Sequence, residues 1–163
     1  MYAVVLLTEE ALTADDAARV VGLHPDELAA GGLSYRVLVP ADTQRNLLVA
    51  VLDNVAFGEF DELRRDLADE PADQARAEAG QALTTTLESL RSTGAQAAGA
   101  ITADDPLPAL RSAVEGHDVD EVIVVTRPHL LEETFHRDWA SRARRELGVP
   151  VLHVYDRSGG RVG

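Results

Sequence analysis

The chain of 163 residues has no cysteine and no lysine, and aromatic residues make up only 4% of it. The absence of cysteine excludes disulfides and thiolate metal sites. All 15 basic residues are arginines, and 28 acidic residues outnumber them, so the net charge is −13. Nucleic acids and anionic membranes both attract clustered positive charge, so we expect neither as a partner.

Long hydrophobic runs are also absent. The apolar start, residues 1–7, has no basic segment before it and is followed at once by Glu9 and Glu10. It therefore matches neither a signal peptide nor a membrane span, and we expect a cytoplasmic protein. The length suits one domain, which we place at residues 1–156. The polar, glycine-containing residues 157–163 are expected to form a flexible tail.

Short apolar runs alternate with stretches of helical periodicity along the chain. Strands are predicted at 3–7, 35–39, 95–101, 121–125 and 150–155. Helices are predicted from the N-cap Thr13 to Gly22, at 71–93, from an Asp104 or Asp105 cap to Gly116, and at 135–147, with one further helical turn at 26–28. Residues 43–67 fit two short helices, but they also fit a surface loop or an insertion.

This alternation predicts an α/β fold: an open, doubly wound, five-stranded parallel sheet, Rossmann-like, with helices on both faces and strand order 3-2-1-4-5. Ligands of such sheets bind beyond the carboxyl ends of the strands where the strand order reverses, here between strands 1 and 4. The candidate ligand-binding residues at this place are Thr8, Glu9, Asp104, Asp105, Thr126, Arg127 and His129.

Three stretches resemble the universal stress protein family. Residues 104–106 with the helix to Gly116, residues 118–125 and residues 148–154 look like its G-D-P loop, its aD-x-I-V-V strand and its closing P-V-L-V-V strand. The similarity covers the last third of the chain well, whereas the first two thirds match only in the order of elements. The resemblance implies the fold, a cytoplasmic location and a homodimer, which we place at the C-terminal strand Val151–Tyr155.

The glycines of that family's ATP-binding motif are absent from this sequence. ATP-binding members carry G-x-x-G-x9-G-[ST] after the fourth strand, where glycines let backbone N–H groups approach the phosphates. The corresponding positions are Thr126, His129, Trp139 and Ala140, so all three glycines are replaced. The resemblance therefore implies no standard ATP site.

Three candidate groups have alternative interpretations. Arg127 follows strand 4 and could clamp a phosphate or carboxylate, or pair with a nearby acid. Asp104 and Asp105 could contact a ribose hydroxyl or Mg²⁺, or simply cap the next helix. Glu9, with Glu10, fits either a pocket acid or a solvated loop.

A metal site and an active site are weakly indicated. His129, Glu133 and His136 would share a helix face, but they do not form H-E-x-x-H and no fourth ligand is placed. We expect no metal. No nucleophile elbow, P-loop or G-x-G-x-x-G is present, so a hydrolase or transferase using these three residues is a distant third hypothesis.

The sequence thus favours a non-enzymatic, homodimeric stress-response or regulatory module with a protein partner and no cofactor. The alternative is a module that binds a nucleotide, ATP or AMP, or another small anion at an altered site.

Overall fold

The computed structural model describes residues 1–41, 70–103, 106–126 and 144–155. In these ranges it contains a five-stranded sheet with the order β3-β2-β1-β4-β5. The strands are β1 (Tyr2–Thr8), β2 (Leu33–Pro40), β3 (Gln96–Thr102), β4 (Glu121–Thr126) and β5 (Val151–Tyr155). All neighbouring strands pair in parallel, so the predicted sheet and its strand order are confirmed.

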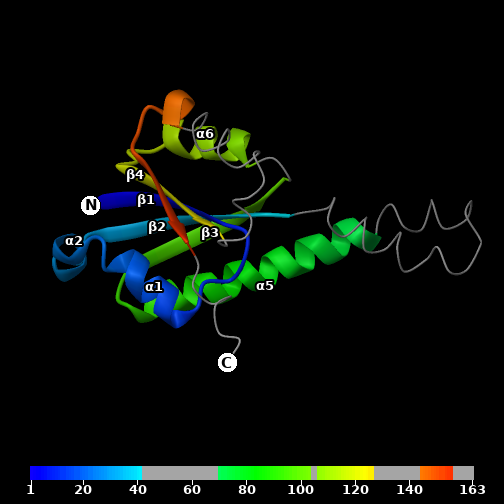
Figure 1. Ribbon diagram of the computed structural model, residues 1–163, viewed down its shortest axis with the longest axis horizontal. Coiled ribbons are helices and arrows are strands. Elements are labelled where there is room, and N and C mark those ends of the chain that lie inside the picture. The colour runs from blue at the N-terminus through cyan, green and yellow to red at the C-terminus, as the bar shows by residue number, and fades with distance from the viewer. Residues whose placement is uncertain (42–69, 104–105, 127–143, 156–163) are drawn as a thin grey trace, which may run out of the picture.

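Helices lie on both faces of the sheet, as Figure 1 shows. The helices are α1 (Ala14–Val21), α2 (Pro25–Ala29), α5 (Glu70–Ser92) and α6 (Leu107–Glu115), and residues 144–147 are also helical. Helix α5 packs on β2, β3 and α1 on one face, while α6 contacts β1 on the other. None of the helices within the described ranges is long and apolar enough to cross a membrane.

The central strand β1 is buried on both faces, which explains its uninterrupted apolar sequence. Val4 and Leu6 belong to the core beneath α1 and α5, and Val5 and Leu7 belong to the core beneath α6. A strand between two helical layers needs apolar side chains at every position, because alternate side chains point to opposite faces.

Helix α5 presents a stripe of apolar residues at helical spacing to the core. Ala75, Ala79 and Leu90 are buried, while Leu83 and Leu87 are partly buried against the same core. Gly94 ends the helical segment with φ 97°, a backbone conformation that glycine adopts without the steric cost of a Cβ.

Helix α6 begins one or two residues later than predicted. Its N-cap is Pro106, which makes no side-chain cap hydrogen bond, so the prediction of Asp104 or Asp105 as the cap was wrong. The Pro106 carbonyl accepts the first helical bond from Leu110 N at 2.9 Å, a role that needs no N–H on the proline. Leu110 is fully buried, and Ala113 is more deeply buried than Val114.

The two edges of the sheet are β3 and β5. On β5, His153 is half-buried, and its ring centroid lies 4.8 Å from that of Tyr155 on the same strand face. The predictions for 43–67, most of the helix at 135–147 and the tail fall outside the described residues.

Candidate functional site

The reversal of strand order lies where it was predicted. Strand β1 has β2 on one side and β4 on the other, so the chain winds away from β1 in two directions. Leu7 pairs with Val124 and Thr8 with Val125, which brings the carboxyl ends of β1 and β4 to the same edge. Open α/β sheets bind their ligands beyond this edge.

Three predicted site residues come together here. Thr8 ends β1, Glu9 follows it as an exposed residue, and Thr126 ends β4. The other four candidates, Asp104, Asp105, Arg127 and His129, lie outside the described residues, as do Glu133 and His136. Among the residues that the structure does describe, no three His, Asp or Glu side chains are grouped as a metal would require.

Thr8 is engaged within its own loop. It is only 2% exposed, and its hydroxyl donates a 2.7 Å hydrogen bond to the Glu10 carbonyl. The hydroxyl proton is therefore used to shape the turn that follows β1.

Helix α5 holds the backbone of the same loop at Leu12. The N–H of Leu12 donates to Thr86 Oγ1 at 3.0 Å, and the Leu12 carbonyl accepts from Ser89 Oγ at 3.1 Å. Thr86 is fully buried, and the Leu12 side chain is 1% exposed. Both backbone groups of Leu12 are thus satisfied by one helix, which fixes the loop on the sheet.

Sequence reasoning missed this clamp. Thr86 lies three residues after Leu83 and four before Leu90 on the apolar stripe of α5, so a hydroxyl at a core position was the available signal. A buried hydroxyl requires a partner, but the sequence does not say which backbone group provides it.

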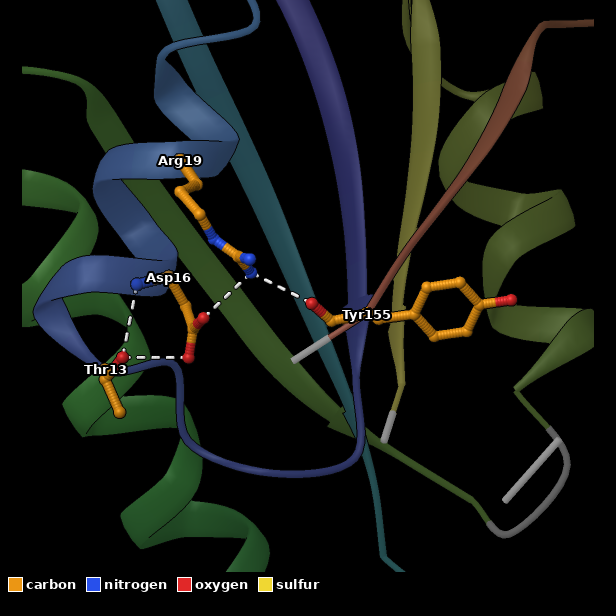
Figure 2. A network of polar contacts seen from close by, with 4 residues as sticks. All are labelled: Thr13, Asp16, Arg19 and Tyr155. Atoms are coloured by element: carbon orange, nitrogen blue, oxygen red, sulfur yellow. Dashed lines mark hydrogen bonds and ion pairs between the residues drawn. The ribbon is translucent and has the colours of Figure 1, made fainter. Parts of the chain in front are cut away.

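A second network fixes the start of α1, and Figure 2 shows it. Thr13 is the N-cap: its hydroxyl accepts from Asp16 N at 3.2 Å and donates to Asp16 Oδ2 at 2.8 Å. The other carboxylate oxygen of Asp16 accepts from Arg19 Nη2 at 2.9 Å. The same nitrogen donates to the Tyr155 carbonyl at 2.9 Å, at the end of β5.

This network explains how Asp16 can be 2% exposed. Burial of a carboxylate is costly unless charge and hydrogen bonds offset the lost water. The cation of Arg19, the Thr13 hydroxyl and the first turn of α1 together provide these interactions. The helix start is therefore already occupied by an acid of the chain itself.

The described segment between β1 and the first turn of α1 is rich in acidic residues. Glu9, Glu10, Asp15 and Asp16 occur within eight residues of the sequence between β1 and the first turn of α1. Asp16 is paired with the cation of Arg19.

A separate polar cluster lies at the opposite, amino-terminal edge of the sheet. His24 Nε2 lies 2.7 Å from Glu121 Oε2, and the His24 ring contacts the Tyr2 ring at a centroid distance of 4.7 Å. Burial, and next the charge of Glu121, raises the pKa of the Tyr2 and Tyr35 phenols. This cluster binds the α1–α2 corner to β4, far along the strands from the candidate site.

No family model and no curated protein matches the sequence. Solved structures do match it over nearly the whole chain. A universal stress protein from Archaeoglobus fulgidus has a TM-score of 0.55 at 14% identity, with 94% of each chain covered. The structure of the universal stress protein from the same organism in complex with dAMP has a TM-score of 0.53 at 15% identity, covering 94% of this chain and 98% of that one.

A universal stress protein family protein from Arabidopsis thaliana with AMP bound has a TM-score of 0.56 at 12% identity, covering 96% of this chain and 94% of that chain. The chain is therefore a doubly wound α/β protein, and its fold is that of the universal stress proteins. The resemblance found in its sequence is confirmed for the fold.

Proposed function

We propose that this chain is a non-enzymatic regulatory module with the universal stress protein fold, which acts through protein contacts and not through a standard ATP site. One observation carries the proposal. The described polar groups beside the end of β1 stabilise the fold itself: Thr8 bonds Glu10, Thr86 bonds Leu12 and Asp16 bonds Thr13. The replacement of all three motif glycines supports the same conclusion.

The proposal includes a homodimer. Strand β5 is an edge, and its Leu152 and Tyr155 are 37% and 41% exposed. An edge strand with exposed large side chains is suited to pairing with a second copy through Val151–Tyr155. A stress-response role and a cytoplasmic location are proposed from the likeness in fold, which by itself does not determine function.

Native mass spectrometry of freshly purified protein tests the module, first alone and then with added AMP or ATP. The proposal expects the mass of the bare chain or of its dimer, with no nucleotide adduct in either spectrum. A stoichiometric adduct that survives purification, or one that saturates on titration, would contradict it and favour the second candidate.

The second candidate is a nucleotide-binding module with an altered phosphate site. The dAMP and AMP complexes of proteins with this fold favour it. In this case the Arg127 guanidinium would replace the glycine cradle and hold a phosphate, aided by the backbone from Thr126 to His129. Asp104 or Asp105 would then contact the ribose.

This candidate predicts that Arg127→Ala lowers AMP affinity about tenfold or more, because a charge-assisted contact is lost. The matched control is Arg76→Ala, which removes the same charge from an exposed position on α5. Equal affinities in calorimetric titrations of the two variants would exclude Arg127 as the phosphate ligand.

A further inference from the structure

Among the described residues, no strand covers the outer side of the β5 backbone. Val122 N of β4 donates to Pro150 O at 2.9 Å, which fixes the register of the parallel ladder. Residues of an edge strand alternately direct their backbone groups toward the neighbouring strand and away from it. The residues whose backbone groups point away from β4 are therefore Val151, His153 and Tyr155.

Arginine side chains occupy two of these outer carbonyls. Arg19 Nη2, from α1, donates to the Tyr155 carbonyl at 2.9 Å, as Figure 2 shows. Arg144 Nε, from the helical segment before β5, donates to the Val151 carbonyl at 3.4 Å. The outer carbonyls at the two ends of β5 thus accept hydrogen bonds from arginine side chains. If a second strand paired with this edge, its backbone N–H groups would donate to these carbonyls instead.

The opposite edge shows the same arrangement. Ala41 N, beyond β2, donates to Thr102 O, so Ala97 is one of the residues of β3 that direct their backbone groups outward. Arg91, in the last turn of α5, donates to the Ala97 carbonyl from Nε at 3.0 Å and from Nη2 at 2.7 Å. Two N–H groups of the Arg91 guanidinium thus donate to the same carbonyl at the β3 edge.

Guanidinium groups are effective competitors for these carbonyls. A hydrogen bond from a cation is stronger than one from a neutral N–H, and the planar fork of arginine is preorganised. Arg19 is further held by Asp16, whose side chain is 3% exposed. The edges need such protection, because Ile101 on β3 and Tyr155 on β5 leave 39% and 41% of their area exposed.

We propose that Arg19 and Arg144 close the β5 edge, and Arg91 the β3 edge, against pairing with an edge strand from a second copy of this chain. The homodimer proposed above then forms through β5 only in molecules in which Arg19 and Arg144 have left the two carbonyls. The positions of Arg19 and Arg144 thus control strand pairing at β5. Arg91 keeps the β3 edge closed, so the assembly stops at two copies.

The experiment compares the association of Arg19→Ala/Arg144→Ala with that of the wild type by sedimentation velocity over a range of concentrations. The double variant is expected to dimerise about tenfold more tightly, since two competing hydrogen bonds are gone. Amide hydrogen exchange is expected to slow at His153 in the associated form. Loss of positive charge from a chain of net charge −13 opposes association by itself, so the change in charge cannot produce this result.

Arg76→Ala is the control, because it removes one positive charge from an exposed position on α5, and its association is expected to equal that of the wild type. Arg91→Ala is expected to associate with slowed exchange at β3 amides instead of β5 amides. Circular dichroism checks that each variant is folded. If the loss of Arg19, the partner of Asp16, unfolds the double variant, Arg144→Ala and Arg91→Ala still test the proposal.

Unchanged or weaker association of folded variants, or tighter association with protection outside the edge strands, would overturn the proposal. The proposal rests on the homodimer proposed above: the association of the wild type tests that homodimer, and the difference between the variants and the wild type tests the role of the arginines.

Discussion

His24 and Glu121 form a buried contact across the amino-terminal edge of the sheet, with 2.7 Å between Nε2 and Oε2 and 13% of each side chain exposed. These atoms lie within ion-pair distance but are not aligned for a hydrogen bond. Their attraction therefore depends on charge on the imidazole. The contact ties the residue before α2 to the first residue of β4, which are 97 positions apart in the sequence.

We expect His24→Ala to lower the free energy of unfolding by about 1–3 kcal/mol, because it leaves the Glu121 carboxylate buried without its partner. Glu121→Gln should cost less, and the double variant should be more stable than the sum of the two losses predicts. Urea unfolding of the four proteins measures the coupling. Strictly additive losses would show that the two side chains do not interact.

Tyr35 makes the folded protein sensitive to alkali. It is 1% exposed, and its hydroxyl donates to the Val20 carbonyl at 3.4 Å. Burial, followed by the charge of Glu121, raises the pKa of this phenol far above its ordinary value. The native state therefore keeps the proton at a pH where the unfolded chain has lost it, so stability should fall as the pH rises above about 10.

Tyr35→Phe should reduce this alkaline loss, because the titrating group is removed, while stability near neutral pH changes by about 1 kcal/mol or less. Part of the loss should remain, because the pKa of Tyr2 is also raised. Thermal unfolding across the alkaline range measures the slope, with the exposed Tyr155→Phe as the control. An unchanged slope in Tyr35→Phe would contradict the assignment.

The sheet could be predicted from the sequence because its causes are local and repetitive. Apolar runs such as Val4 to Leu7, separated by amphipathic helices, allow few arrangements other than a doubly wound parallel sheet. Thr13 and Gly94 marked helix ends, because capping chemistry depends on the residue type itself.

Less of the candidate site than of the sheet could be predicted from the sequence. The pattern placed Thr8 and Thr126 at the strand ends, but it did not show that Thr8 would be buried or that Thr86 would bond Leu12 from 74 residues away. The arginine bonds to edge carbonyls were equally hidden. Hydrogen bonds between a side chain and backbone groups far away in the sequence form only in the assembled fold, so no periodicity in the sequence predicts them.

At Gly99, strand β3 lies close to the neighbouring strand β2 and to helix α5, which packs on the sheet. A Cβ at this position would lie far inside van der Waals distance of the Val37 carbonyl oxygen and only 2.7 Å from Leu83 Cδ1. We expect Gly99→Ala to destabilise the protein by about 1–3 kcal/mol, because strand and helix must shift to admit the methyl group.

Gly80 provides the matched control, since a Cβ there would meet Ile101 Cδ1 at an ordinary 3.7 Å. Gly80→Ala should stabilise the chain by up to about 1 kcal/mol through the higher helix propensity of alanine. Thermal denaturation of both variants should therefore give shifts of opposite sign. Similar shifts in the two variants would mean that the packing at Gly99 is not the cause.

The clamp of α5 on Leu12 predicts how the loop after β1 responds to a change far away in the sequence. Thr86→Val keeps the size of the side chain but removes the acceptor of the Leu12 N–H, which then stays buried without a partner. We expect a loss of about 1–3 kcal/mol in the free energy of unfolding. Thr85→Val, at an exposed position on the same helix, should change it by no more than about 0.5 kcal/mol.

Hydrogen exchange separates a loosened loop from general destabilisation. In Thr86→Val the Leu12 amide should exchange faster by more than the global loss of stability explains, because its own hydrogen bond is gone. Amides in the centre of β1, such as that of Leu6, should accelerate only in proportion to the global change. If both amides accelerate equally, Thr86 contributes to the stability of the whole domain, and the loop beside the candidate site is held by its other contacts.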